Sequence, residues 1–485
     1  MSKARLKSIL LVGLIFSSIV LTCYMWFSEK LWPGGYNFFA SMPFSFGRGQ
    51  VQSTLTKESL SDPQRVVVTN VGNRSVYAPD TDEGAAVVQT VKEILKATLS
   101  SAESMAAVEE EWNGALKSKS MHVVYPVAYD GRLFANILGV QQNNPAVKTA
   151  KEFVISTGDI VSSDISVYSR DALTGEIVKI PVKWDKEQLE TQIEQTATGS
   201  IGSYSYSFEL HFDDHALDPT KVELQQQDGT TAAQQPAYLE SDVLIMPQRG
   251  TARMIKEINP LFDNDYNRGM IADVLRQFGF NTIGARKYME SDNSIVYVEN
   301  YGTLKFHSNG LIEYKAVNPE KGISLNGATS GASYGSILAC VDFVNTLWNR
   351  ALPGQRLNLN ISSDVVDIRS RDFTLTMDYY AEGTAVRMEI PMNNAHEAMH
   401  HAVEIQVMDN RMVSYRQVMT YFEPTEETVR MGSAIDALDS LFADTQWQGE
   451  TISDLYLTYV LNGSSLWQPM WAAKAGNQVV TVIGQ

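Results

Sequence analysis

The chain has 485 residues, with 39 Lys and Arg against 56 Asp and Glu, and a formal net charge of −17. A surface with this balance repels phosphate backbones, so composition argues against nucleic acid as a partner. The length and the 44% hydrophobic content exclude a single small domain. At about 100–200 residues per domain, they predict roughly two to four domains.

The N-terminal segment predicts a membrane anchor. Residues Ser8–Phe27 (SILLVGLIFSSIVLTCYMWF) carry no charge, and a helix of this length spans about 30 Å, the thickness of the hydrocarbon core. Lys3, Arg5 and Lys7 precede this run without an acidic residue. Basic flanks stay on the cytoplasmic side, so we expect residues 1–7 to be cytoplasmic. The predicted localisation is the cell membrane, single-pass, with the bulk of the chain extracytoplasmic.

Two alternatives concern the same segment. A cleaved signal peptide also begins with basic residues, but its apolar core spans about 7–15 residues, and no small-residue cleavage site follows directly here. A lipoprotein would use Cys23, but Thr22 is larger than the residue expected just before a lipidated cysteine. Cys340 is the only other cysteine, so no disulfide is expected outside the membrane. A lone cysteine in an exported protein is typical of a Gram-positive surface.

Small residues recur at a spacing of four along the predicted anchor. Gly13 and Ser17 are four positions apart, as are Ser18 and Thr22. Such spacing lets a second membrane helix approach closely. We therefore expect transmembrane partner contact at Gly13, Ser17, Ser18 and Thr22. The alternative is that Gly and Ser are simply common in membrane helices.

The remaining sequence predicts a linker and three extracytoplasmic domains. Residues 28–62 are rich in Gly, Ser and Pro and predict a juxtamembrane linker. The boundaries predicted for the domains are 63–184, 185–322 and 323–485. Beyond residue 27 the balance is 36 Lys and Arg against 56 Asp and Glu, or −20, which favours a soluble exterior.

Hydrophobic periodicity predicts the elements of each domain. In the first we expect strands at 65–71, 122–127, 165–168 and 177–182, and helices at 84–98 and 102–116. In the second we expect helices at 186–194 and 268–278, and strands at 204–212, 222–226, 238–246, 295–299, 304–307 and 311–315. In the third we expect helices at 337–349 and 431–442, and strands at 373–380, 386–390, 402–408, 413–422, 455–461 and 467–473. The class is α+β, with helices packed on antiparallel sheets. The second and third domains share an order, helix followed by antiparallel meander, and are expected to be similar.

One motif could carry chemistry. His396, Glu397 and His400 form H-E-x-x-H, which on a helix binds zinc through both histidines while the glutamate activates water. The flanking segments read as strands, however, so we interpret the motif as a polar connection. A surface zinc metallohydrolase using HEAMH is the alternative function. The other histidines are scattered, which neither favours nor excludes a dispersed Ser-His-Asp set.

The layout resembles the YycH family. The residues that carry the likeness are the opening strand and helix (PQRVVVTN…VQTVKEIL), the central meander (SIVYVENYGTLKFHSNGLIEYKA) and the C-terminal runs (VEIQVMDNRMVSYRQVMTYF…ISDLYLTYVLNGSSLWQPMWAA). The likeness covers most of the chain, as one of pattern and order.

This resemblance implies a regulator that is not an enzyme. Its expected partners are the sensor histidine kinase WalK (YycG) of a Gram-positive two-component system and the companion regulator YycI, contacted through membrane helices. The process implied is cell-wall metabolism. No catalytic residue, metal or cofactor is expected.

Overall fold

The structure is a computed structural model. The residues it describes are 55–56, 59–77, 82–158, 164–197, 204–209, 238–240, 242–245, 251–325, 332–362, 365–366, 371–391, 398–444, 447, 449–461, 466–475 and 478–482. The predicted anchor, with Gly13, Ser17, Ser18 and Thr22, lies outside them. Among the described residues, no helix is both long enough and apolar enough to span a membrane.

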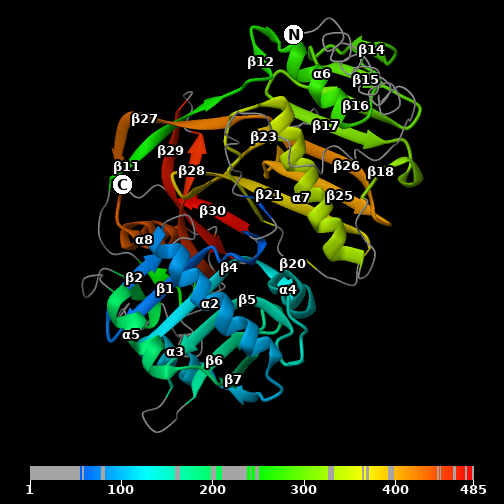
Figure 1. The fold of residues 1–485 in the computed structure, drawn as a ribbon. Helices are drawn as coiled ribbons and strands as arrows, with labels where there is room; N and C mark the ends of the chain where they lie inside the picture. Colours follow the sequence, from blue (N-terminus) through cyan, green and yellow to red (C-terminus); the bar gives the residue numbers. More distant parts are fainter. Residues whose placement is uncertain are drawn as a thin grey trace, which may run out of the picture. The chain divides into compact units, whose positions relative to one another are not determined.

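The N-terminal strands form an antiparallel sheet in the order β2-β1-β4-β5-β6-β7-β3 (Figure 1). Its strands are β1 (Arg65–Asn70), β2 (Asn73–Tyr77), β3 (Met105–Ala107), β4 (Ser120–Asp130), β5 (Thr149–Ser156), β6 (Ile165–Arg170) and β7 (Ile177–Val182). A short strand from much later in the chain, β20 (Val365–Val366), pairs in parallel with β4. The first sheet therefore includes residues from the C-terminal third of the chain.

Helices cover both faces of this sheet. One face carries α2 (Asp82–Ser100), α4 (Gly131–Leu138) and α5 (Lys186–Thr196), whose apolar side chains join those of the strands in one core. The other face carries α3 (Glu109–Lys117), through its buried Trp112. Successive side chains of a strand alternate between the two faces, except near the irregular pairing of β4 with β5 between Val124 and Tyr129.

Side-chain caps fix where several helices begin. Asp130 accepts hydrogen bonds from the backbone of the first turn of α4, and Asp185 does the same for α5. Asn267 caps α6 (Arg268–Gln277), and Gly279, at φ 76°, follows its end. Each cap satisfies a backbone donor that lacks a partner within the helix.

The later strands form a larger sheet in the order β14-β15-β16-β17-β26-β25-β21-β22-β28-β29-β11-β27. These strands are β11 (Thr251–Ile258), β14 (Arg286–Met289), β15 (Ile295–Val298), β16 (Gly302–Phe306), β17 (Leu311–Ala316), β21 (Phe373–Ala381), β22 (Thr384–Val386), β25 (Val403–Met408), β26 (Arg411–Val418), β27 (Tyr421–Arg430), β28 (Thr451–Leu461) and β29 (Leu466–Ala475). Four short strands join its side or ends: β9 (Tyr238–Leu239), β18 (Ile323–Ser324), β19 (Leu359–Ile361) and β30 (Gln478–Val482). Three two-stranded pairs complete the strands: β8 (Ser205–Tyr206) with β10 (Leu244–Ile245), β12 (Phe262–Asp263) with β13 (Asp265–Tyr266), and β23 (Ile390–Pro391) with β24 (Ala398–Met399).

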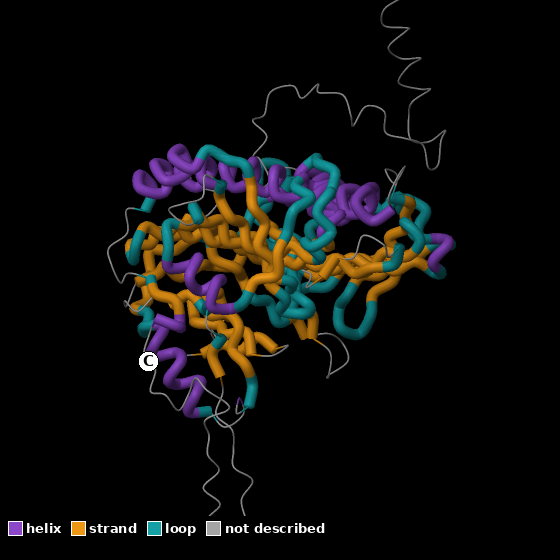
Figure 2. The backbone as a smooth tube through the Cα atoms, turned by 90° about the horizontal axis from the view of Figure 1, so that it is seen from below, coloured by secondary structure: helices purple, strands orange, loops and turns teal. Residues whose placement is uncertain are grey.

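Two helix-and-strand units meet in the middle of the larger sheet. Helix α6 is followed by the β14–β17 meander, and α7 (Ala332–Ala351) by β21, β25 and β26. Strands β17 and β26 pair directly, with Tyr314 opposite Tyr415. The ring of Phe278, which follows α6, lies 5.0 Å from that of Phe343 on α7 and 5.3 Å from that of Tyr415. Figure 2 shows helices in a layer along one side of the strands.

A smaller core closes the C-terminal end of the larger sheet. Helix α8 (Ala434–Ala443) begins with a capping box between Ser433 and Asp436. Its Leu438 and Leu441 are buried in a cluster with Trp471 of β29. The indole N–H of Trp471 donates to the carbonyl of Gly432, which ties β29 to the start of the helix.

The structure confirms the mixed α+β class, with large antiparallel sheets. Several element predictions were wrong in detail. The helix expected at 102–116 begins only at Glu109, because Met105–Ala107 pairs with β7. The single strand expected at 413–422 is two, β26 and β27, and the one at 386–390 is likewise divided between β22 and β23. The strand expected at 222–226 lies outside the described residues.

Candidate functional site

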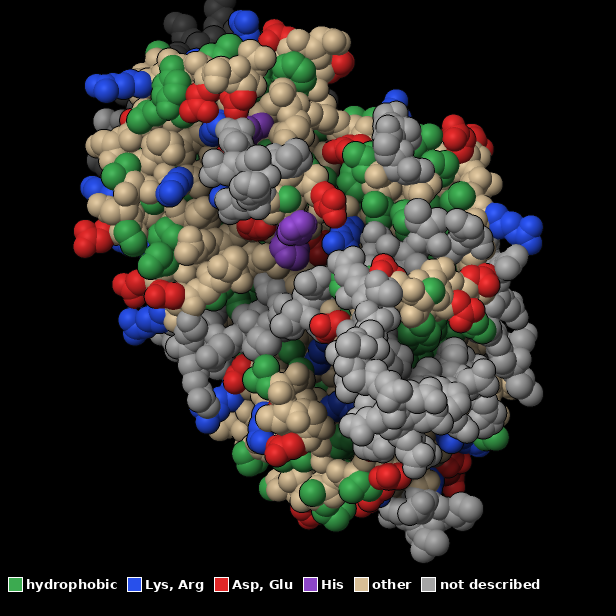
Figure 3. Space-filling model, turned by 180° about the vertical axis from the view of Figure 1, so that it is seen from behind, with side chains coloured by type: hydrophobic (Ala, Val, Ile, Leu, Met, Phe, Trp, Pro, Cys, Tyr) green, Lys and Arg blue, Asp and Glu red, His purple; other side chains and the backbone are tan. Residues whose placement is uncertain are grey.

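A cleft of about 1350 Å³ opens between the two sheets. Strands β1, β4, β5 and β6 line one wall, and strands β21, β22, β28 and β29 line the other. Side chains of both charges and of histidine gather near the middle of the face drawn in Figure 3. The acidic residues of the lining are Glu109, Glu152, Asp171, Glu240, Asp242, Asp378 and Asp454. The Lys and Arg residues are Arg65, Lys151, Arg170, Arg387 and Lys474, so the formal charge balance of the lining is acidic.

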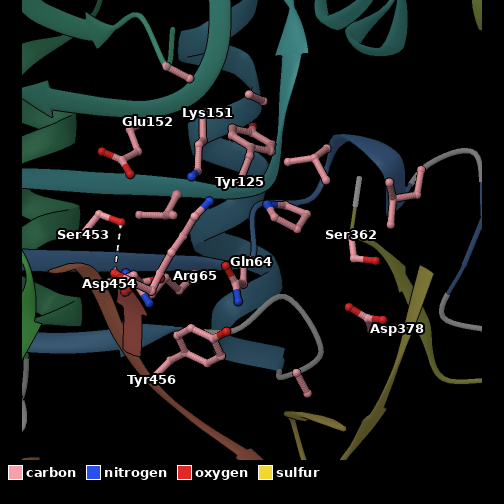
Figure 4. Close-up of a pocket in the computed structure, with 18 of the residues that line it drawn as sticks. Gln64, Arg65, Tyr125, Lys151, Glu152, Ser362, Asp378, Ser453, Asp454 and Tyr456 are labelled. Carbon is pink, nitrogen blue, oxygen red and sulfur yellow. Dashed lines mark hydrogen bonds and ion pairs between the residues drawn. The ribbon is translucent and has the colours of Figure 1, made fainter. Parts of the chain in front are cut away.

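The first wall carries a row of side chains set by strand register. Arg65 of β1 lies opposite Val124 of β4, Val124 opposite Glu152 of β5, and Glu152 opposite Arg170 of β6. Residues directly opposite one another share a face of the sheet. The sheet therefore presents a carboxylate between two guanidinium groups, and Figure 4 shows Arg65 and Glu152 in the cleft.

Both guanidinium groups of the row are already paired. Arg65 Nη2 lies 3.1 Å from Asp454 Oδ1 of β28. Arg170 Nη1 lies 2.6 Å from Asp242 Oδ2, and its Nη2 lies 2.9 Å from Glu109 Oε1. The Arg170 guanidinium also sits 4.5 Å from the centre of the Trp112 ring, whose Nε1 donates to Asp242. These contacts fix both arginines against the acidic groups around them.

Unlike the two arginines, Glu152 is not in an ion pair with any described residue. Its carboxylate forms no hydrogen bond or ion pair within the described part of the chain. Burial raises its pKa to about 7, with Asp242 adding to the shift and Lys151 and Arg170 opposing it. The neighbouring Lys151 likewise has no ion pair among the described residues, and Figure 4 shows both side chains at the cleft. One anion and one cation of the cleft are thus left without a partner of their own.

Three residues that line the cleft carry a buried side-chain atom without a hydrogen bond among the described residues: Arg65, through its Nε, His122 and Tyr125. His122 is 4% exposed, and its Nδ1 lies 3.1 Å from Tyr206 Oη, while its Nε2 has no hydrogen bond. Burial, then Arg65 and Arg170, lower the pKa of His122 to about 3, so the ring is neutral at physiological pH. Tyr125 is fully buried, and its hydroxyl is also unpaired. Unpaired buried polar atoms are rare in folded proteins, but these three are shielded from solvent in this arrangement. A ligand in the cleft reaches them only if neighbouring side chains move.

The far end of the cleft holds a Ser-His-Asp group. His401 Nδ1 lies 2.9 Å from Asp378 Oδ1 and 3.2 Å from Ser362 Oγ. A nucleophilic triad needs the carboxylate at one ring nitrogen and the serine at the other. Here both oxygen atoms face the same nitrogen, so His401 does not act as a base toward Ser362 in this arrangement.

The HEAMH motif is only partly described. His396 and Glu397 lie outside the described residues, as do the four anchor residues. Ala398–Met399 is strand β24, paired with Ile390–Pro391, and the exposed His400 follows it. The described half of the motif is therefore extended, whereas zinc binding by H-E-x-x-H requires a helix. Among the described residues, no group of three or more His, Cys, Asp and Glu side chains is placed to hold a metal ion.

The cleft itself was not predicted from the sequence. The only local signal is a charged residue on a strand face that otherwise reads as buried, as Glu152 in TAKEFVIS. Its partners come from β1, β6 and β28, and no spacing in the sequence links these segments. Such a site is found only once the strands are paired.

No protein-family model matches the sequence, and no curated protein does. Among solved structures, the crystal structure of YycH from Bacillus subtilis is similar to this chain, with a TM-score of 0.56 and 10% sequence identity. The match covers 90% of this chain and 99% of that one. The chain therefore has a YycH-like fold, as the resemblance in sequence pattern predicted. At this identity the likeness concerns the fold.

Proposed function

We propose that this chain is a membrane-anchored extracytoplasmic regulator that modulates a sensor histidine kinase of the WalK (YycG) type. It acts by protein–protein contact, without catalysis, on a system that controls cell-wall metabolism, together with a YycI-like companion. The observation that carries this proposal is the YycH-like fold along 90% of the chain. The mixed-charge cleft, with its two paired arginines and no triad geometry at His401, also suits binding better than bond cleavage.

The anchor supports the same role. Ser8–Phe27 is uncharged and follows three basic residues, which favours an uncleaved helix with the bulk of the chain outside. Gly13 and Ser17, with Ser18 and Thr22, offer a small-residue surface at which a kinase membrane helix could pack closely.

The paired units of the larger sheet support the proposed similarity of the second and third domains. Helices α6 and α7 each precede antiparallel strands, and the last strand of each unit, β17 and β26, lies at the junction. In the sheet order the units run in opposite directions from this junction, β17-β16-β15-β14 on one side and β26-β25-β21 on the other. This arrangement is the one expected for two similar units related by an approximate two-fold axis.

A neighbour shifts a kinase between signalling states only by the difference in its contact free energy with the two states. Close packing and interhelical hydrogen bonds in membranes contribute about 0.6–2 kcal/mol each. Even at the lower end of that range, two such contacts made in only one state would shift the equilibrium by a factor of roughly ten. A few residues of the anchor are thus sufficient for regulation.

Co-purification of the full chain with the kinase from membranes tests this proposal. The double substitution Gly13→Leu with Ser17→Leu fills the small-residue surface, and recovery of the kinase should fall several-fold. The matched control is Val12→Leu with Ile19→Leu, which introduces the same side chain on the face turned away from both small-residue pairs and should leave recovery unchanged. Equal recovery with both pairs would contradict the proposed contact surface, and absence of the kinase from the unaltered preparation would contradict the proposed partner.

A further inference from the structure

We propose that the cleft between the two sheets is a binding site for a short peptide, with a ligand ammonium group at Glu152 and a ligand carboxylate at Lys151. This inference stands apart from the regulatory role proposed above, because it concerns binding to the chain alone. The site combines a large cleft with two groups of opposite charge, Glu152 and Lys151, that form no ion pair among the described residues.

The first step is the charge pattern. Arg65 faces the carboxylate of Asp454, and Arg170 faces those of Asp242 and Glu109, so the charge of each guanidinium is already balanced. Glu152 stands between them in the same row, with no ion pair or hydrogen bond in the described part of the chain. An ammonium group carries three donors and a full positive charge, and it is the ligand group that suits an unpaired carboxylate.

The second step is the neighbouring cation. Lys151 precedes Glu152 on β5, and both side chains reach the cleft (Figure 4). A ligand with one ammonium and one carboxylate complements this pair, whereas a polyanion is disfavoured by the acidic balance of the lining. Free amino acids and peptides with free ends have these two charges.

The third step is size and the uncharged groups. The cleft, at about 1350 Å³, exceeds the roughly 300–1,000 Å³ of pockets for single small molecules. Gln64, Ser453 and Tyr456 supply neutral polar side chains to the same lining (Figure 4). Peptide N–H and C=O groups are suitable partners for them, which favours a short peptide over a single amino acid.

Binding to Glu152 should depend on pH. The charged and titratable groups that face it are Lys151 on β5, Arg65 on β1, Arg170 on β6, His122 on β4, Asp454 on β28, and Glu240 and Asp242 in the segment around β9 and β10. Because burial raises the pKa of Glu152 to about 7, its carboxyl is mostly protonated at pH 5.5 and mostly charged at pH 8. An ammonium ligand needs the charged form, so affinity should rise about tenfold or more over this range.

The test uses the full chain in detergent micelles and a library of tetrapeptides with free ends, in equilibrium dialysis read by mass spectrometry. The unaltered chain should enrich a subset of peptides, and Glu152→Gln should reduce that enrichment about tenfold or more, since a charge-assisted hydrogen bond is lost. The matched control is Glu187→Gln on the exposed side of α5, which should leave enrichment unchanged. Lys151→Met should remove the preference for free over amidated C-termini.

An N-acetylated library tests the same contact without a variant, because acetylation removes the ammonium group of the peptide. The unaltered chain should enrich none of these peptides. The proposal is overturned if the unaltered chain enriches no peptide, or if Glu152→Gln or N-acetylation leaves enrichment intact. Since no kinase is present, these results are independent of the co-purification experiment.

Discussion

Arg65 of β1 and Asp454 of β28 are 389 positions apart in the sequence, and their side chains meet at 3.1 Å. Each belongs to a different sheet, and both line the cleft between the sheets. Burial disfavours the charge of Arg65, but the nearby Asp454 outweighs it and keeps the pKa of the guanidinium above its ordinary value. This ion pair is therefore a link between the two halves of the cleft.

Removing the charge of Asp454 should loosen that link. Asp454→Asn leaves a largely buried guanidinium without its counter-charge, and we expect a loss of about 1–3 kcal/mol in the free energy of unfolding. Chemical denaturation of the full chain in detergent measures it. The matched control is Asp409→Asn, whose partner Arg371 is 69% exposed while Asp409 is 79% exposed. Exposed pairs contribute little, so the control should change stability by less than about 0.5 kcal/mol, and equal effects would contradict the role given to Asp454.

Glu152 should make the folded chain less stable as pH rises. Its pKa is about 7 in the folded state, against about 4.3 when unfolded. Because the folded state binds this proton more tightly, no penalty exists below pH 4, and the penalty grows as pH rises from about 4.5 to 7. It should reach roughly 3–4 kcal/mol by pH 8.

Glu152→Gln tests the sign of this effect. Without ligand, the variant should be more stable than the unaltered chain at pH 8 and about equal to it at pH 4.5, as measured by denaturation at both values. Glu187→Gln serves again as the exposed control, with no such pH-dependent difference. A variant that is less stable at pH 8 would show that the Glu152 carboxylate has a stabilising partner in the folded chain.

The sequence predicted the elements whose burial follows a local period. Val87, Val91 and Leu95 give α2 one apolar face, and β16 alternates between buried and half-buried side chains as a half-buried strand should. Helix α4 was not predicted, because it has only eight residues and directly follows β4. Short elements offer too few repeats of a period to be recognised.

The sequence could not predict which strands pair when they are far apart along the chain. The pairing of β20 with β4, and that of β17 with β26, depends on which surfaces meet in three dimensions. The local sequence of β20 does not indicate that β4 is its partner. The cleft depends on the same pairings, because its two walls come from distant strands. The anchor prediction rests on a single uncharged run and needs no partner strand, and it stays a prediction because the segment lies outside the described residues.

Asp242 should be important for the packing of α3. It accepts from Arg170 at 2.6 Å and from the indole of the fully buried Trp112 at 3.2 Å. Asp242→Ala leaves the buried indole N–H unpaired and removes the closer counter-charge of Arg170, so we expect a loss of about 2–4 kcal/mol in stability. The matched control is Glu109→Gln, at the other, more exposed contact of Arg170, which should cost less than about 1 kcal/mol. Denaturation followed by tryptophan fluorescence measures both, and a smaller loss for Asp242→Ala than for Glu109→Gln would contradict this ranking.

The last prediction concerns the HEAMH segment and the alternative function of a zinc hydrolase. Because Ala398–Met399 is a strand, His400 does not follow a helical turn from His396, and the geometry that H-E-x-x-H needs is not formed in the described half. We expect the purified full chain, after exposure to zinc and desalting, to retain much less than one zinc ion per chain, and His396→Ala or His400→Ala to leave that content unchanged. His215→Ala, at a histidine outside the motif, is the control. Stoichiometric zinc that is lost with His396→Ala and kept with His215→Ala would favour the hydrolase and count against a regulator that acts by contact alone.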